Sequence, residues 1–321
     1  MALSEFELIR NYFTAATAPR ADVALGIGDD CALLRPPPGQ LLAATMDTLV
    51  EGRHFPAAAE PEALGHKALA VNLSDLAAMG AEPAWAMLAL TLPQADSDWL
   101  DAFMRGLSAL AGRHGVALVG GDTTRGPLSI TLQVQGFVEP DRALRRDAGR
   151  VGDHLLVSGT LGDAALALNR LQAGTAPGEV DPGLLARLER PTPRVELGRL
   201  LRGLASAAID LSDGLLADLG HVCAASGVGA EIDLRRLPLS PQVASACADG
   251  DWSPALAGGD DYELLFSVPP ERLAAVTGAC ARAGETVKEI GRLVDEPGIR
   301  LVHPDGRVTE ETPRGFDHFL R

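Results

Sequence analysis

The sequence is poor in lysine, and its charge is strongly acidic. Lysine occurs only at Lys67 and Lys288, arginine supplies the other positive charges, and 43 acidic residues against 28 basic ones give a formal charge of −15. Non-specific binding of nucleic acid needs a basic surface, so this balance argues against it. It does not exclude a phosphate-bearing substrate, because bound cations can reverse the local sign of the potential.

Cysteine and long apolar runs are scarce as well. The four cysteines, at positions 31, 223, 247 and 280, form no Cys-x-x-Cys pair. We expect them to be small core residues in a reducing compartment. The first ten residues, MALSEFELIR, carry acids where a signal peptide would carry basic residues. No apolar run approaches the ~18 residues that span a bilayer. These features predict a cytoplasmic protein.

Several catalytic signatures are missing. The chain has no GxxxxGK[ST] segment, no protein-kinase signature set and no Gly-x-Ser-x-Gly elbow. Its seven histidines show no HExxH spacing, which argues against a zinc site. The glycine-rich segment SGTLGD at 158–163 is typical of a turn from a strand to a helix. Because the GxxxxGK[ST] segment is missing, a P-loop is excluded.

Length and composition predict a mixed α/β protein with two domains. The chain has 321 residues, 46% of them hydrophobic, with 35 glycines and 22 prolines. We place the domains at 1–140 and 150–321, joined by an arginine-rich segment at 140–152. Strands are expected at 23–25, 41–45, 84–91, 116–119, 128–138, 154–158, 207–210, 231–234, 262–268, 287–294 and 299–303. Helices are expected at 62–79, 97–113, 161–172, 183–190, 194–203, 214–225 and 270–283.

The most informative feature that is present is a set of aspartates inside short apolar segments. They occur in the segments GIGDD (26–30), TMDT (45–48), NLSDL (72–76), GGDT (120–123), DLSDG (210–214) and GGDDYE (258–263). A buried carboxylate is costly unless it is paired, hydrogen-bonded or bound to metal. Aspartates with hydroxyls, without His or Cys, suit Mg²⁺, Mn²⁺ or Ca²⁺. The pattern predicts a Mg²⁺-nucleotide site built from several loops.

Each of these residues also has a purely structural interpretation. Asp213 could cap the following helix, the pair at 29–30 could form a turn, and Arg146 could be a surface residue of the linker. Asp75 is harder to explain in this way, because it lies inside an apolar helical stretch where aspartate has poor propensity. Asp122 follows an expected strand, the usual place for a ligand in an α/β sheet. Cys31 is expected to be a core residue rather than a nucleophile.

Taken together, the motifs resemble the thiamine-monophosphate kinases, a family of the superfamily named after aminoimidazole ribonucleotide synthetase. The resemblance rests on GIGDDCALL, TMDTLVEGRHF, KALAVNLSDLAAMGAEP, VGGDTTRGP, GRVGDHLLVSGTLGDA, AIDLSDGLLADL, GGDDYELLF and GFDHF, which run from residue 26 to residue 319. It implies an N-terminal α/β domain with metal and ATP loops, whose sheet pairs with that of a second subunit. A C-terminal α/β domain would close over the nucleotide and hold the thiamine pocket.

The resemblance also implies an activity: Mg²⁺-assisted transfer of the ATP γ-phosphoryl group to thiamine monophosphate. Several Mg²⁺ ions would be held by Asp30, Thr45, Asp47, Asp75, Asp122, Asp210 and Asp213. ATP would be held by Gly121, Asp122, Arg146 and Ser212, and the thiamine part by His54, Glu263 and Phe316. The family segment Arg-Ser-Gly-Ala reads RDAG at 146–149 here, which leaves the contacts of that loop open. Phe319 is an alternative to Phe316 as the stacking aromatic.

The expected chemistry needs no protein nucleophile or base. An acceptor phosphate is already an oxyanion, so neutralising the repulsion between donor and acceptor is the main task. The alternatives are the other superfamily enzymes and a binding module without catalysis. Selenophosphate synthetase and the hydrogenase-maturation dehydratase depend on a reactive Cys near one end, and no Cys precedes Cys31 here. We expect a homodimer that binds neither nucleic acid nor membrane.

Overall fold

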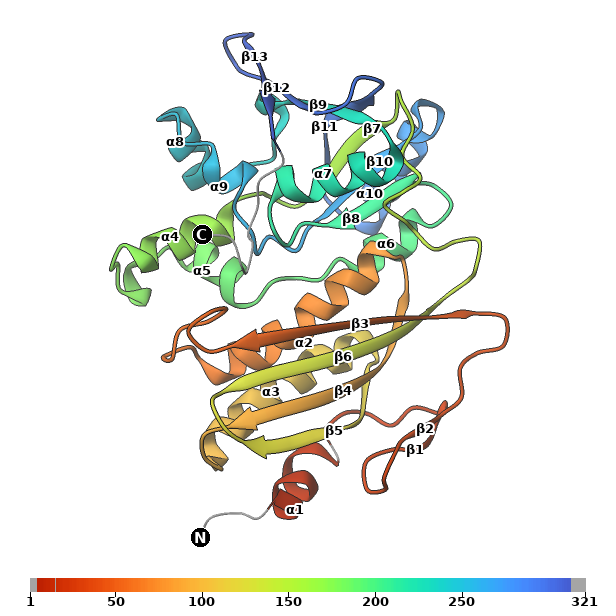
Figure 1. Cartoon of the computed structure of the whole chain (residues 1–321), viewed down its shortest axis with the longest axis vertical. Coiled ribbons are helices and arrows are strands. Elements are labelled where there is room, and N and C mark those ends of the chain that lie inside the picture. Colours follow the sequence, from red (N-terminus) through yellow and green to blue (C-terminus); the bar gives the residue numbers. More distant parts are fainter. Residues whose placement is uncertain (1–4, 15, 313–321) are drawn as a thin grey trace. The chain divides into compact units, whose positions relative to one another are not determined.

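The structure is a computed structural model that describes residues 5–14 and 16–312. The chain divides into two compact units, one of residues 1–76 and 81–141 and the other of residues 77–80 and 142–321. Figure 1 traces the chain and labels its elements. A mixed α/β architecture with two domains, as predicted, is confirmed by this division and by the elements of each unit.

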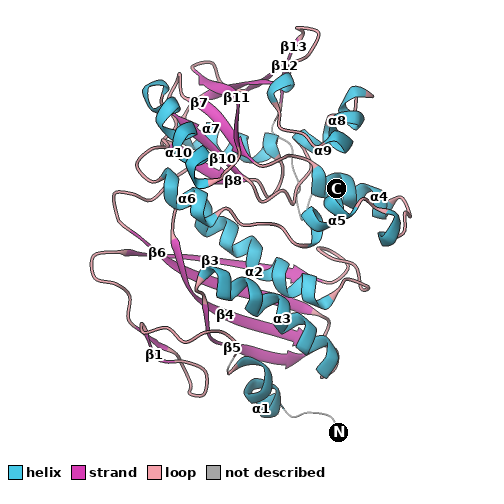
Figure 2. Ribbon diagram, turned by 180° about the vertical axis from the view of Figure 1, so that it is seen from behind, coloured by secondary structure: helices cyan, strands magenta, loops and turns pink. Residues whose placement is uncertain are grey.

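The first unit is built on a four-stranded sheet in the order β3-β6-β4-β5, with only the β4–β5 pair parallel. Helices α2 and α3 cover one face of this sheet (Figures 1 and 2). Apolar residues alternate along the strands, so the helix-facing side of β6 is buried and its other side is half-exposed. The elements are α1 (Glu5–Leu8), η1 (Ile9–Phe13), β1 (Val23–Leu25), β2 (Leu33–Leu34), β3 (Leu41–Val50), α2 (Pro61–Ala78), β4 (Glu82–Leu92), α3 (Ser97–His114), β5 (Ala117–Arg125) and β6 (Ser129–Val138).

Two glycines allow α2 and α3 to pack backbone against backbone. A Cβ at Gly65 would overlap the carbonyl oxygen of Phe103, and one at Gly106 would overlap the carbonyl oxygen of Glu62. Asp96 caps α3 by accepting from two backbone N–H groups, at 3.0 and 3.1 Å. The close approach fixes α2, the helix that carries Asp75, against its neighbour.

The second unit contains a seven-stranded sheet in the order β13-β12-β9-β11-β7-β10-β8. Its pairs are antiparallel except β12–β9. The buried core gathers apolar side chains from the central strands and from α7, among them Val157, Ile209, Leu219 and Leu265. The elements are β7 (His154–Ser158), α4 (Asp163–Gln172), η2 (Pro177–Glu179), α5 (Pro182–Glu189), α6 (Val195–Leu201), β8 (Ala207–Asp210), α7 (Leu215–Ser226), β9 (Gly229–Asp233), η3 (Leu234–Arg236), α8 (Pro241–Ala248), α9 (Ser253–Leu256), β10 (Leu264–Val268), η4 (Pro270–Arg272), α10 (Leu273–Ala283), β11 (Val287–Val294), β12 (Ile299–Val302) and β13 (Val308–Glu311).

Some local predictions were wrong. Strand β3 continues to Val50 and strand β5 to Arg125, well beyond the predicted ends at 45 and 119. The short elements β2, α8, α9 and β13 were not predicted. Cys31 is exposed rather than part of a core, whereas the other three cysteines are buried. No helix in the described part of the chain is long and apolar enough to cross a membrane.

Candidate active site

Two aspartates and a threonine meet between strand β3 and helix α2. Thr45 and Asp47 alternate with exposed residues on β3, so both point toward the helix-covered face. The Thr45 hydroxyl donates a hydrogen bond to Asp75 on α2. Asp47 is also hydrogen-bonded to Asp75. The structure thus unites three of the predicted metal ligands in one half-buried cluster of oxygen atoms.

The two carboxyl groups of this cluster lie close enough to alter the pKa of Asp47. Burial, followed by the negative charge of Asp75 and the hydrogen bond with it, raises the pKa of Asp47 to about 6. Two carboxylates at one site repel each other, so ionisation of the second is disfavoured unless a positive charge lies nearby. A divalent ion bound here would therefore stabilise the ionised form of both residues.

Asp122 lies on the other edge of the same sheet. It is exposed on β5, directly after Gly121. Gly121 has φ = 150°, and a Cβ there would overlap the backbone of Leu88 on β4. Across the sheet Asp122 pairs with Ala89, Ala89 with Thr131, and Thr131 with Thr48. Paired residues point to the same side. Asp122 therefore lies on the face and the edge opposite to those of Asp47.

Asp30 lies in the loop between β1 and β2, and His54 lies in the loop between β3 and α2. Asp30 is exposed, and its backbone N–H donates to the Asp29 carboxylate at 2.8 Å. The His54 ring accepts from the backbone N–H of Val50 through Nδ1 at 2.9 Å, which leaves the proton on Nε2.

In the second unit, Asp210, Ser212 and Asp213 follow strand β8 and lead into helix α7. Asp210 is buried at the strand end, and the other two are half-buried. The loop is held by Asp218, whose carboxylate accepts the backbone N–H groups of residues 212, 213 and 214, each at 3.1 Å. Burial, together with the nearby charge of Asp213, raises the pKa of Asp218 to about 7.

Asp218 was missed by the sequence reasoning, although it stands inside the quoted motif AIDLSDGLLADL. The signal was available. Asp218 is a buried acid on the first turn of a helix that directly follows a loop of small residues, and such a position suits capture of the free N–H groups of that loop. Asp218 thus fixes the backbone of the loop that carries Ser212 and Asp213.

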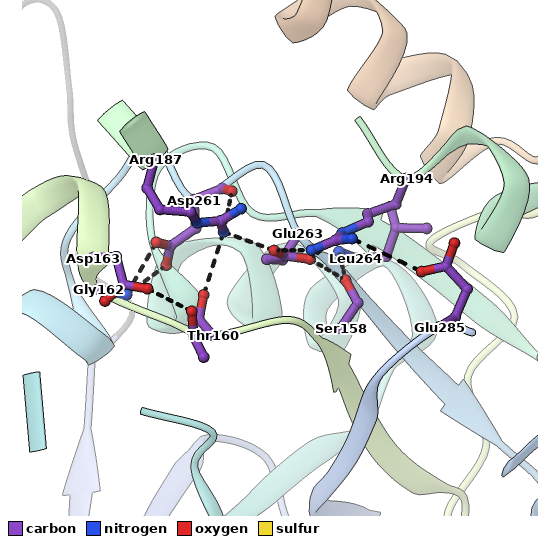
Figure 3. Close-up of polar contacts among 10 residues, drawn as sticks. All are labelled: Ser158, Thr160, Gly162, Asp163, Arg187, Arg194, Asp261, Glu263, Leu264 and Glu285. Atoms are coloured by element: carbon purple, nitrogen blue, oxygen red, sulfur yellow. Dashed lines mark hydrogen bonds and ion pairs between the residues drawn. The ribbon is translucent and has the colours of Figure 1, made fainter. Parts of the chain in front are cut away.

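The remaining candidates have different surroundings. Arg146 is exposed, and its backbone carbonyl accepts from Ser226 Oγ at 2.9 Å. Glu263 is fully buried and lies between Arg187 and Arg194 (Figure 3). Phe316, like its alternative Phe319, lies outside the described residues.

The donor chemistry around Asp47 and Asp75 fits Mg²⁺. Carboxylate and hydroxyl oxygens are the ligands that this ion prefers, and it commonly takes only one or two carboxylates with water and phosphate oxygens as the rest. Within residues 5–14 and 16–312, no group of three His, Cys, Asp or Glu side chains is arranged as a complete metal site. A pair of carboxylates that is completed by the substrate phosphates agrees with both observations.

Models of two protein domains match the two halves of the chain. The N-terminal domain of AIR synthase related proteins matches residues 28–138, and the C-terminal domain of the same group matches residues 150–304. A thiamine-monophosphate kinase of Salmonella typhimurium is 49% identical over an alignment of 328 positions, which covers 99% of this chain and 99% of that one.

Two solved structures share the fold over most of the chain. The crystal structure of a thiamine-monophosphate kinase from Stenotrophomonas maltophilia has a TM-score of 0.87 and 47% identity, and the match covers 96% of this chain and 99% of that one. AaThiL complexed with AMPPCP and TMP has a TM-score of 0.77 and 35% identity, with 91% and 92% covered. With both domain matches and near-complete coverage at this identity, the chain belongs to the thiamine-monophosphate kinase family.

Proposed function

We propose that this protein is a kinase that transfers the γ-phosphoryl group of ATP to thiamine monophosphate, giving thiamine diphosphate and ADP. The observation that carries the proposal is the oxygen cluster of Thr45, Asp47 and Asp75 in a chain that is 49% identical to a thiamine-monophosphate kinase over its length. The reaction joins two phosphates, so charge neutralisation is the main requirement. We therefore assign no residue as nucleophile or general base.

The metal sites belong to this proposal. Bound Mg²⁺ ions would neutralise the phosphate oxygens during transfer. The cluster on β3 and α2 would hold one part of the metal set, and the loop after β8 another. The proposed ligands are Asp30, Thr45, Asp47, Asp75, Asp122, Asp210 and Asp213.

The substrate contacts are proposed from the family resemblance. ATP would contact Gly121, Asp122, Arg146 and Ser212. The backbone of Gly121 suits this role, because a residue without a Cβ lets a phosphate approach the main chain closely. The thiamine part would contact His54, Glu263 and Phe316. The His54 ring is oriented through Nδ1 by the backbone N–H of Val50, whereas Glu263 is held by two arginines.

We also propose a homodimer formed through the open face of the four-stranded sheet. Exposed apolar side chains stand on that face of β3, including Leu42, Met46 and Val50. Asp122 and Asp47 lie on opposite edges and faces of one sheet, so one protomer alone cannot bring them to a shared ion. A second copy that packs against the open face would complete a shared site only by bringing its Asp122 to the β3 edge of the sheet, beside which Asp47 lies. The free cysteines agree with a reducing compartment such as the cytoplasm.

The direct test is to incubate the protein with Mg²⁺, ATP and thiamine monophosphate and to identify the products. Thiamine diphosphate and ADP should form only when all three are present, and free thiamine should be a poor substitute because it lacks the attacking phosphate. ADP formation with another acceptor and none with thiamine monophosphate would assign the chain to another activity of the superfamily. Nucleotide binding without any turnover would identify a binding module.

A further inference from the structure

Glu263 has no free acceptor position in this structure. Its carboxylate accepts from Ser158 Oγ at 2.5 Å, from Arg187 Nη2 at 2.7 Å, and from Arg194 through Nε and Nη2, both at 2.6 Å (Figure 3). A carboxylate has about four lone-pair sites, so these four bonds use all of them. A ligand that hydrogen-bonds to Glu263 would have to displace one of these partners.

The residues that surround Glu263 come from separate parts of the second unit. Ser158 ends strand β7, Arg187 lies on α5, and Arg194 precedes α6. Ser158 Oγ also accepts the backbone N–H of Leu264 at 2.9 Å, and Arg187 donates to the carbonyl of Asp261 at 3.1 Å. The carboxylate thus joins three elements to the segment that carries it.

Gly159 shows how closely this arrangement is packed. Its φ is 57°, and a Cβ there would overlap the carboxylate of Glu263 and come within 2.8 Å of Arg194 Nη2. The carboxylate therefore occupies the space that a side chain at position 159 would need. Buried ion pairs of this kind add little net stability, but removing one partner leaves a costly unpaired charge. The geometry is therefore narrowly determined.

The segment next to Glu263 has an unusual backbone. Asp260 and Tyr262 are the only described residues other than glycine with positive φ, at 69° and 49°. Such conformations persist when the surroundings over-determine them, and they concentrate at functional sites. Between the two, Asp261 is buried and accepts the backbone N–H of Gly162 through both oxygens at 3.0 Å.

This strained turn is bonded to the loop that we assign to metal and ATP. The Asp260 N–H donates to the Ser212 carbonyl at 2.9 Å, and the Tyr262 N–H donates to the Leu211 carbonyl at 2.8 Å. In return, the Leu211 N–H donates to the carbonyl of Glu263 at 2.8 Å. Three backbone hydrogen bonds therefore fix residues 211 and 212 relative to residues 260–263. Residues 211 and 212 lie between Asp210 and Asp213.

We propose that Glu263, clamped by Arg187 and Arg194, is a positioning residue for the Asp210–Asp213 loop. It acts by locking the turn at 260–262, which in turn sets the backbone that presents Ser212 and the two aspartates. The proposal deepens the proposed function, since it rests on the assignment of this loop to Mg²⁺ and ATP. It gives Glu263 a role that needs no contact with the thiamine moiety.

The test compares Arg194→Lys with Arg235→Lys. Arg194→Lys keeps the charge but loses the two-pronged contact with Glu263. Arg235 makes the same kind of contact with Asp233, at 2.9 and 2.8 Å, at an exposed site, so its lysine variant is the matched control. Two measurements are made on each folded protein: backbone hydrogen exchange at residues 211 and 260–263 without ligand, and the Kd for Mg²⁺-AMPPCP. The Michaelis constants for ATP and thiamine monophosphate are then determined.

For Arg194→Lys we expect faster exchange at the amides of residues 211, 260 and 262, and a Kd for Mg²⁺-AMPPCP raised by about 10-fold or more. The Michaelis constant for ATP should rise with it, and the control should leave all of these unchanged. Ser158→Ala, which removes one bond to Glu263, should give a smaller change of the same kind. If Arg194→Lys does not fold, Ser158→Ala replaces it as the test variant.

Three outcomes would overturn the proposal. A rise confined to the Michaelis constant for thiamine monophosphate, with unchanged exchange, would make Glu263 a direct substrate contact. Unchanged exchange together with an unchanged nucleotide Kd would remove any positioning role. A lower melting temperature with wild-type constants per folded molecule would leave a purely structural role. If the unmodified protein fails to phosphorylate thiamine monophosphate, the proposed function fails, but exchange and AMPPCP binding still decide this question.

Discussion

At the scale of single residues, Asp75 has an environment that stability alone does not explain. It lies within α2, where aspartate has poor helix propensity, and it faces another carboxylate, Asp47. Asp75→Asn should lower turnover by about 100-fold or more, because under our proposal it removes a metal ligand. Without metal, the same change should not lower the melting temperature, since it relieves repulsion and an amide oxygen can still accept from Thr45.

Initial rates over a series of Mg²⁺ concentrations, with melting temperatures measured in chelator, check this prediction. Asp101→Asn is the control, because Asp101 is exposed on α3 in the same unit. A near wild-type rate of Asp75→Asn at saturating Mg²⁺ would show that this residue is not a ligand.

The raised pKa of Asp47 predicts how stability depends on pH without metal. The folded protein holds the proton of Asp47 up to about pH 6, whereas the unfolded chain releases it near 3.8. The contribution of Asp47 to the free energy of unfolding should therefore be largest below about pH 4. It should fall by about 1–3 kcal/mol as the pH rises toward 6. Urea unfolding in chelator at several pH values measures this slope, and Asp47→Asn should flatten it. An equal slope in the variant would assign the dependence to other groups.

The sequence was sufficient to single out the aspartates but not their surroundings. Asp75 could be recognised because an acid inside an apolar helix violates local preference. The position of Asp218 on the first turn of α7 was a weaker signal, because the number of N–H groups that it accepts depends on how the preceding loop folds. The partners of Glu263 lie 69 to 105 residues away in the chain, so no local pattern could indicate them.

At the scale of elements, the contact between α2 and α3 depends on glycine. Gly106→Ala should destabilise the protein by about 2–3 kcal/mol, because the new Cβ would overlap the carbonyl oxygen of Glu62 and force the helices apart. At Gly112 on the same helix, an added Cβ would meet nothing within 4 Å. Gly112→Ala should therefore stabilise the protein by about 0.5–1 kcal/mol. Chemical denaturation of both variants gives the comparison. Similar effects from the two changes would contradict the close packing.

Strand boundaries show where sequence patterns are insufficient. The alternation in 128–138 was clear, and β6 follows it closely. By contrast, β3 includes Asp47 and Thr48, and β5 includes Asp122, all of which were taken for loop residues. Polar residues can continue a strand when a neighbouring strand supplies hydrogen bonds, and ten register pairs with β6 hold β3 in this way. Pairing over such distances cannot be read from a local segment.

At the scale of the whole molecule, the open face of the first unit's sheet is the surface that requires a partner under our proposal. Met46 is 60% exposed on β3, and Leu42 and Val50 stand on the same face of this strand. Met46→Asp should convert the proposed dimer into a monomer and reduce turnover, because a charge would be buried in the interface. Val308→Asp changes an apolar residue of similar exposure, 53%, on β13 and should do neither.

Sedimentation equilibrium of the two variants and the unmodified protein measures the oligomeric state directly. A second measurement tests whether the subunits share a site. Asp75→Asn and Asp122→Asn, each inactive when purified alone, should recover part of the activity after they are unfolded, mixed and refolded together, because a mixed dimer can combine Asp75 of one copy with Asp122 of the other. Since Asp75 lies on α2 beside β3 and Asp122 lies on β5 at the other edge of the sheet, recovery would require the second copy to complete the site. A dimer without recovery would confine each site to one protomer, and a monomeric unmodified protein would remove the dimer from the mechanism.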